Sequence, residues 1–342
     1  MSRRDRTTGI PRQRERASAT QEPTFLGMRW GETHWRFLIL GGVALIGLLV
    51  FGLIGWRWYD ENVRQPNSVV LRVEDQEFTL DYFTERLPGF AQANPSLSTG
   101  FREPALLTKL EEEAITIILA EERGIDLSED AVTQWIADDL GVPVGGAGSS
   151  FDTLYRQRLR TQGLTNADYR RLARAELADT KLIEALREER GETGRMVTLR
   201  VVAVSEEAEA AAIRQRVEDG EDMGTIAQTE SLDLESRQQD GLTQPAPPEL
   251  YTADVQSQIS DQPEDALIGP FKVGNNWWVV RIERIQDDGT YSATNRDQLA
   301  EVDLADLIDE QRTALDIKQS LTNSDIEWAY RHVDAVAGTT NN

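Results

Sequence analysis

Side chains that could carry acid–base or covalent chemistry are scarce in this sequence. Its 342 residues include no Cys and two His, His34 and His332. Without Cys there is no thiol nucleophile, no disulfide framework and no Cys-ligated zinc site. Two His leave almost nothing for histidine-based metal binding or a Ser–His relay. We therefore expect no metal and no cofactor, and a conventional hydrolase is poorly supported.

The charge balance argues against nucleic acid as a partner. Lys and Arg number 36 and Asp and Glu 59, which gives a formal net charge of −23. Phosphate binding requires clustered Lys and Arg. Hydrophobic residues at 39% and charged residues at 28% are close to a normal globular mix, which excludes a fully disordered chain, a collagen or a multi-span transporter. The length suffices for two domains or three short ones.

One stretch, residues 37–56, is long and apolar enough to cross a bilayer. Its 20 residues carry no charge and match the ~30 Å of a hydrocarbon core at about 1.5 Å per residue. Trp35 precedes it, and Trp56, Trp58 and Tyr59 mark its other end, as in an interfacial aromatic belt. The alternatives are a buried core helix or the apolar region of a cleaved signal peptide, which is usually shorter.

The flanking charges predict the orientation of this span. Residues 1–36 hold eight Arg against four acidic residues, so we predict a disordered cytoplasmic tail there and an extracytoplasmic location for residues 57–342. Close to the span the count slightly opposes this orientation, with Arg29 and Arg36 on one side and three Arg on the other. We keep the orientation because long domains translocate largely regardless of charge.

A packed, mostly helical domain is expected after the span. A β-rich run at 69–73 precedes Thr79, which is placed to cap a helix that Pro88 and Gly89 would end. Further helices with apolar stripes are predicted to begin at Pro104, Ser128, Phe151 and Thr165. In the first of these, the side chains expected to face water are Glu111, Glu112 and Glu113.

The pattern then changes to that of a small α+β unit. β-branched residues predict a strand at 196–204, followed by a helix that Ser205 would cap. Two further strands, at 268–273 and 277–285, flank a Gly-Asn-Asn hairpin signal. We expect a four-stranded sheet covered by helices, followed by a final helical region. The fold class is therefore α+β with one transmembrane helix.

Two regions resemble known families. Residues 69–83, 120–132 and 164–177 resemble the first domain of SurA- and PrsA-type secretion foldases. Residues 196–285 resemble a parvulin (PpiC-type) peptidyl-prolyl isomerase domain, through segments 204–209, 219–223, 231–233, 269–270 and 277–282. The resemblance implies a SurA-like chaperone domain over 68–190, a parvulin-like domain over 195–285, and a C-terminal helical region at 296–332 that packs on the chaperone domain.

The parvulin resemblance departs from the family at the proline site. Parvulins usually place two His in facing strands there; the corresponding positions are Val201 and Trp278, and no His lies between residues 57 and 331. The usual Gly-Gly-Asp-Leu-Gly run is reduced to residues 239–242. We therefore name no catalytic residue. The candidates for a peptide groove are Val201, Leu242, Phe271, Trp278, Asp233 and Asp240. For the two Asp the alternative is a solvated loop position, and Trp277 should point away from Trp278.

The leading hypothesis is a single-span, extracytoplasmic foldase-like chaperone. The resemblance implies binding of unfolded or proline-containing segments of exported polypeptides, with weak or no isomerase catalysis. A binding slot for proline without its polar catalytic groups can hold ground and twisted states alike and give no rate gain. Two alternatives stay open: an active isomerase with a rearranged site, and a non-catalytic structural subunit of a membrane complex.

Overall fold

The computed structural model describes residues 24–25, 28–29, 32–145 and 149–339. It divides into two compact units, residues 1–66 and 67–342. Most of the predicted tail lies outside the described residues. Within it, β1 (Thr24–Phe25) and β2 (Met28–Arg29) form an antiparallel pair.

The first unit contains the predicted span. Helix α1 (Glu32–Tyr59) continues into a π-helical turn, η1 (Asp60–Arg64). Residues 42–64, which run from α1 into η1, contain an 18-residue window with a mean hydropathy of 1.6, and by length and composition this segment could cross a membrane. Leu48 and Phe51 are 74% and 77% exposed. A core helix would bury such side chains, so the core-helix alternative does not hold in this unit.

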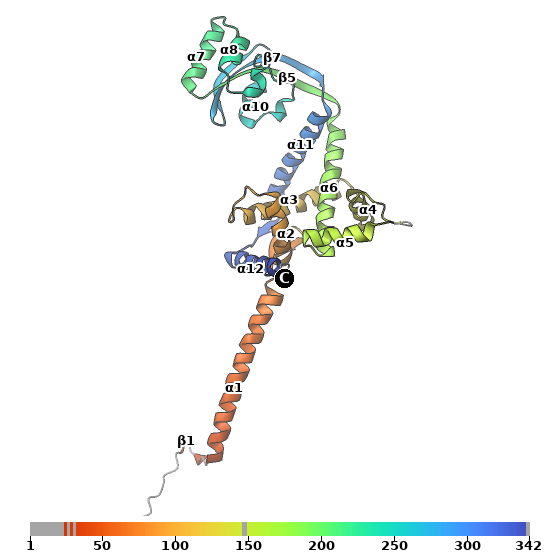
Figure 1. Ribbon diagram of the computed structural model, residues 1–342, viewed down its shortest axis with the longest axis vertical. Helices are drawn as coiled ribbons and strands as arrows, with labels where there is room; N and C mark the ends of the chain where they lie inside the picture. Colours follow the sequence, from red (N-terminus) through yellow and green to blue (C-terminus); the bar gives the residue numbers. More distant parts are fainter. Residues whose placement is uncertain (1–23, 26–27, 30–31, 146–148, 340–342) are drawn as a thin grey trace, which may run out of the picture. The chain divides into compact units, whose positions relative to one another are not determined.

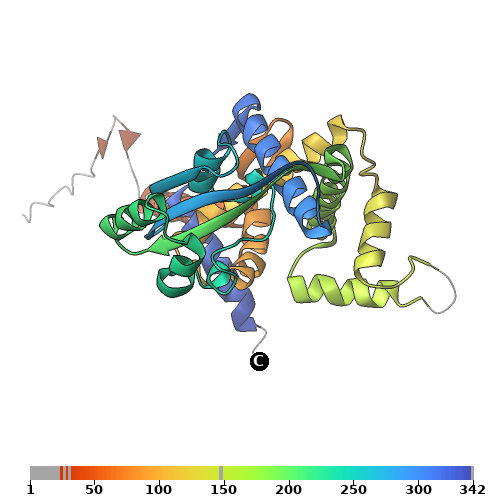
Figure 2. The ribbon, with the colours of Figure 1, turned by 90° about the horizontal axis from the view of Figure 1, so that it is seen from above.

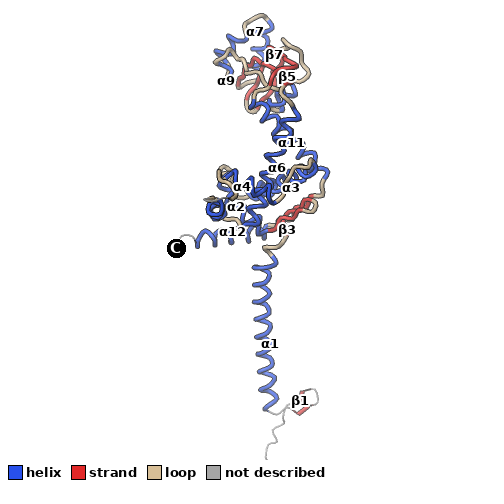
Figure 3. The backbone as a smooth tube through the Cα atoms, turned by 90° about the vertical axis from the view of Figure 1, so that its right-hand side faces the viewer, coloured by secondary structure: helices blue, strands red, loops and turns tan. Residues whose placement is uncertain are grey.

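The second unit is α+β, with two separate antiparallel sheets among many helices (Figure 3). One sheet has the order β4-β3-β8 and is made from β3 (Val69–Val73), β4 (Gln76–Thr79) and β8 (Ile317–Gln319). Strand β8 lies between the last two helices of the chain and pairs with β3 across some 240 residues of sequence. This strand was not predicted, because three residues are too few to show a detectable alternation.

The helices of this region begin largely where capping residues predict. They are α2 (Leu80–Ala93), α3 (Arg102–Glu122), α4 (Glu129–Asp139), α5 (Phe151–Gln162) and α6 (Asn166–Arg190). The caps Thr79, Ser128 and Thr165 are confirmed, since each side chain accepts a backbone N–H three residues on.

The predicted stop at Pro88 is wrong, because α2 continues through it to Ala93. A proline inside a helix removes one backbone hydrogen bond. Leu87 and Phe90 both pack against the core on either side of it. Burial of two large apolar side chains outweighs the loss of that single bond.

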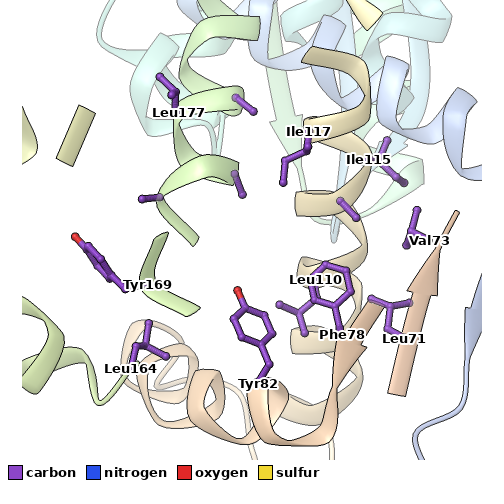
Figure 4. Packing of buried hydrophobic residues seen from close by; sticks show 14 of the residues in the cluster. Leu71, Val73, Phe78, Tyr82, Leu110, Ile115, Ile117, Leu164, Tyr169 and Leu177 are labelled. Atoms are coloured by element: carbon purple, nitrogen blue, oxygen red, sulfur yellow. The ribbon is translucent and has the colours of Figure 1, made fainter. Parts of the chain in front are cut away.

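One core joins the helices and the first sheet (Figure 4). Phe78, Leu110 and Tyr82 from β4, α3 and α2 lie close together in it, and Tyr169 comes from α6. The final helices α11 (Ala293–Ala314) and α12 (Asn323–Thr339) contribute to the same core. Their buried residues are Ala300, Leu304, Trp328 and Ala329. The two ends of this unit therefore share one core.

The expectation that the three consecutive Glu of α3 face water is wrong for two of them. Glu113 is buried and accepts two hydrogen bonds from Arg86 of α2, at 2.9 and 2.7 Å. Glu111 is buried between Arg312 and Gln319 from the C-terminal region. Buried carboxylates need such partners, and these partners come from elements distant in sequence.

The second sheet has the order β5-β7-β6. It consists of β5 (Thr193–Val204), β6 (Leu267–Val273) and β7 (Asn276–Thr290), and the last two form the predicted hairpin. Helices α7 (Glu207–Glu218) and α8 (Met223–Glu230) lie on one side of it, and α10 (Ala253–Ile259) lies on the other (Figure 2). The prediction that Ser205 caps α7 is wrong: the N-cap is Glu206, which makes no side-chain hydrogen bond.

The expected fourth strand is not a regular strand. Residues 241–246 run beside β5 and bond to it through Gly241, Thr243 and Ala246. Pro245, Pro247 and Pro248 lie in or beside this segment, and proline has no N–H to extend a ladder. Short elements, α9 (Leu234–Arg237) and the 3₁₀ turn η2 (Pro248–Leu250), flank it. Figure 1 shows that the neighbouring helices α6 and α11 connect to this sheet: α6 leads into β5, and β7 leads into α11.

Candidate functional site

The second sheet buries a different apolar layer on each face. Side chains alternate along a strand, so Val202 of β5 and Trp277 of β7 pack with α7 and α8. Val201 and Trp278, one residue away in each strand, pack on the other face with α10. The prediction that the adjacent Trp277 and Trp278 point to opposite faces is therefore confirmed.

Three of the six candidate groove residues share the α10 face. In the strand register, Trp278 lies opposite Phe271 on one side and Ala203 on the other, and Val201 lies opposite Val280. Residues opposite one another in an antiparallel pair point to the same face. Val201, Phe271 and Trp278 accordingly belong to one cluster.

These three residues differ in what they can offer a ligand. Val201 is fully buried and is part of the core beneath the face. Phe271 and Trp278 are half-buried, so each keeps part of its ring at the surface. Aromatic rings in this position are suited to packing against apolar side chains, including a proline ring. The position expected for one imidazole therefore holds a core valine, and the other holds a surface-reaching indole.

The other three candidates lie elsewhere. Asp240 is exposed, its carboxylate accepts a hydrogen bond from Gln228 of α8, and its carbonyl oxygen accepts one from Arg200. This contact is on the α8 side of the sheet. Leu242 pairs with Arg200 in an isolated bridge, so alternation directs it away from the Val201 face.

Asp233 has a local structural role. It occupies the N-cap position of α9, and its carboxylate accepts a hydrogen bond from the Ser236 hydroxyl at 2.5 Å. The carboxylates of Asp233 and Asp240 therefore bond to Ser236 and Gln228, outside the aromatic cluster.

Two hydroxyl groups that sequence analysis missed supply the polar character of this face. Thr243 and Tyr251 share a hydrogen bond of 3.2 Å, and the Thr243 hydroxyl also accepts the Leu199 N–H at 3.0 Å. Tyr251 packs against the same cluster as Val201 and Trp278. Burial raises the pKa of Tyr251, partly offset by the hydrogen bond to Thr243. The phenol therefore stays protonated near neutral pH. In the sequence, the feature that could have pointed to Tyr251 is its position as an aromatic residue in a proline-rich loop.

The segment that carries Thr243 is held against β5 by a close backbone contact at Gly241. Gly241 has a φ of +78°, and its carbonyl oxygen accepts the Val201 N–H at 2.8 Å. A Cβ at this position would lie 2.6 Å from the Cβ of Ala227 and 2.8 Å from the carbonyl oxygen of Val201. Only glycine combines this conformation with this space.

Among the described residues no group of three or more His, Asp or Glu could hold a metal ion.

Comparison with known proteins bears on the same segment. The family model described as "PPIC-type PPIASE domain" matches residues 184–293, which span β5 to β7 and the helices between them. No curated protein matches the sequence.

Several solved structures are similar at low sequence identity. PrsA, a peptidylprolyl isomerase from Bacillus anthracis, is 16% identical over 68% of this chain and 97% of its own, with a TM-score of 0.39. The parvulin NmPin of Nitrosopumilus maritimus is 18% identical over 27% of this chain and 98% of its own, with a TM-score of 0.25. One of two SurA-like chaperones of Campylobacter jejuni is 14% identical over 72% and 96%, with a TM-score of 0.27.

The family match and the sheet coincide. The matched segment contains the antiparallel sheet, its covering helices and the aromatic face, and it contains no histidine. Residues 184–293 of this chain, here called the parvulin domain, are therefore similar to the PPIC-type PPIASE domain.

Proposed function

We propose that this chain is a membrane-anchored, extracytoplasmic foldase-type chaperone. It binds unfolded or proline-containing segments of exported polypeptides and catalyses prolyl isomerisation weakly or not at all. In this proposal α1 spans the bilayer with its N-terminus in the cytoplasm, and residues 57–342 lie outside. The helical region built around α2 to α6 is the chaperone domain, with α11 and α12 completing it.

The observation that carries the proposal is the aromatic face of the parvulin domain. Phe271 and Trp278 reach the surface there, above a fully buried Val201. An apolar face of this kind binds a peptide segment through burial of nonpolar area. A rate gain requires groups that bind the twisted amide more tightly than the planar one, and the usual imidazoles are absent from the sequence of this domain.

One observation favours residual catalysis as a second candidate function. The hydroxyls of Thr243 and Tyr251 lie on the aromatic side of the sheet and hydrogen-bond to each other. Either group could donate to a twisted amide once a peptide is bound. A rearranged isomerase site would therefore centre on this hydroxyl pair.

The binding proposal is tested by suppression of aggregation. The full chain in nanodiscs is mixed with a heat-unfolding client protein, and light scattering is followed. We expect suppression at a severalfold molar excess. Trp278→Ser should raise the amount needed several-fold, whereas Trp277→Ser, on the opposite face, should leave it unchanged once both variants are shown to be folded at the assay temperature. No suppression by the unaltered chain contradicts the proposal.

A protease-coupled assay on a proline-containing peptide tests the catalytic half. Uncatalysed isomerisation takes tens of seconds at 25 °C, so catalysis is easily detected. We expect a rate within about twofold of the uncatalysed reaction. Rapid turnover that Tyr251→Phe abolishes would instead support the rearranged isomerase and leave peptide binding intact.

A further inference from the structure

A large cavity lies in the helical region, away from the parvulin sheet. It has a volume of about 980 Å³ and is lined by residues of α2, α3, α5 and α6. Part of its wall is apolar. These apolar residues are Pro88, Gly89, Phe90, Ala93, Leu164, Leu172 and Ala175. The remaining wall is polar or charged, so the cavity suits a ligand with both an apolar and a charged part.

One pair of charges in the cavity wall is already neutralised. Arg86 donates from both terminal nitrogens to the Glu113 carboxylate, and one of these nitrogens also donates to the Tyr82 hydroxyl at 2.7 Å. The Arg86 and Glu113 side chains are 11% and 8% exposed. A buried bidentate pair of this kind is fully occupied, so it contributes little net charge to the cavity.

The remaining charged groups of the wall are mostly acidic. They are Glu85 of α2, Glu176 and Asp179 of α6, and Lys109 of α3. Lys109 is turned toward Glu112, 3.9 Å away. Glu176 and Asp179 are three residues apart and so lie on one side of α6. Within the described part of the chain, neither of their carboxylates has a hydrogen-bond or ion-pair partner within bonding distance.

We propose that this cavity binds a Lys or Arg side chain of an unfolded polypeptide segment, with its aliphatic stem on the apolar wall and its cationic end between Glu176 and Asp179. Long basic side chains have this two-part character. The excess of carboxylates supplies the charge complementarity. The inference deepens the proposed chaperone function and rests on it, because it names the residue type that a second, separate binding site selects.

Desolvation is the main influence on the protonation of the two acids. Solvent reaches Glu176, but protein surrounds it on several sides, and this desolvation raises its pKa to about 7, with nearby Glu113 adding to the effect. Desolvation also raises the pKa of Asp179, while Lys109 opposes the shift. A bound cation would stabilise the charged forms. Binding near neutral pH should therefore release protons.

The test uses the full chain in nanodiscs of neutral lipid and three labelled peptides that differ at one central residue: Lys, norleucine or Glu. Norleucine keeps the aliphatic stem without the charge. We expect the Lys peptide to bind about tenfold more tightly than the norleucine peptide, as for one charge-assisted contact, and the Glu peptide to bind most weakly. The variant Glu176→Gln/Asp179→Asn should lose the preference for Lys over norleucine.

A matched variant separates the cavity from the overall negative charge. Glu188→Gln removes an exposed carboxylate from the same helix, outside the cavity wall, and should keep the preference. Equal affinity for Lys and norleucine, or a preference that survives in Glu176→Gln/Asp179→Asn, overturns the inference. Calorimetry in two buffers of different ionisation enthalpy adds a second readout: proton release on binding for the unaltered chain and its loss in Glu176→Gln.

Failure of this inference is distinguishable from failure of the chaperone proposal. If the chain suppresses aggregation but discriminates none of the three peptides, only the cavity assignment is wrong. If it neither suppresses aggregation nor binds any peptide, both are wrong.

Discussion

The helical region and the parvulin domain treat charge in opposite ways. Among the described residues, the buried acidic side chains are Glu103, Glu111 and Glu113, all on α3. The parvulin domain packs two apolar layers against its sheet, and its buried polar side chains are Ser231 and Ser236. Within the described residues, the region that resembles a catalytic domain therefore buries no acidic side chain, whereas the region expected only to hold clients buries three.

The two regions offer different kinds of selectivity. In the proposal, the aromatic face built on Phe271 and Trp278 discriminates by shape and apolar area, with the hydroxyls of Thr243 and Tyr251 as its polar groups. The cavity beside Glu176 and Asp179 can discriminate by charge. In the same chain, a general apolar surface and a charge-selective site would bind different parts of one extended polypeptide.

The largest expected effect tests the buried charges of the helical region. Arg86→Met leaves Glu113 buried without a partner and should lower the free energy of unfolding by about 3–5 kcal/mol, measured by urea denaturation. Lys181→Ala breaks an exposed pair with Glu184, whose side chains are 48% and 56% exposed, and should cost less than about 1 kcal/mol. Similar losses in both variants would show that the Arg86–Glu113 pair is not enclosed.

The second prediction concerns the loss of stability when the tight apolar packing of the parvulin domain is disturbed. Gly241→Ala places a methyl group 2.6 Å from the Cβ of Ala227 and should destabilise the domain by about 2–3 kcal/mol. Gly220 also has a positive φ, +100°, but a Cβ there meets nothing within 4 Å. Gly220→Ala should therefore cost only about 1 kcal/mol of backbone strain. Thermal unfolding followed by tryptophan fluorescence measures both, and equal shifts would remove the packing argument.

The smallest effect concerns pH and returns to the helical region. The pKa of Glu176 is raised from 4.5 to about 7 in the folded chain, chiefly by desolvation. Between these values the folded state binds more protons than the unfolded state, so this group makes stability fall as pH rises from about 4.5 to 7. Solvent access keeps the contribution below about 1 kcal/mol. Glu176→Gln should flatten this part of the stability–pH profile, and Glu188→Gln should not.

Local patterns predicted the elements well where the determinants lie within a few residues. The caps Thr79, Ser128 and Thr165 bond to backbone groups three positions away, and the Gly274 turn joins two strands that are adjacent in sequence. The stop at Pro88 failed because packing of its neighbours decides the outcome. Among the candidate groove residues, alternation brings Val201, Phe271 and Trp278 to one face, but loop residues such as Asp240 have no periodicity from which a facing direction follows.

Residue type and short-range order are sufficient to predict the apolar span, the alternating helical and β-rich regions, and the lack of His and Cys in the parvulin domain. Long-range packing is what pairs β8 with β3, buries Glu111 and Glu113 with distant arginines, and brings Glu176 and Asp179 to the wall of a cavity. These depend on contacts between residues tens to hundreds of positions apart, whose energies no local pattern encodes.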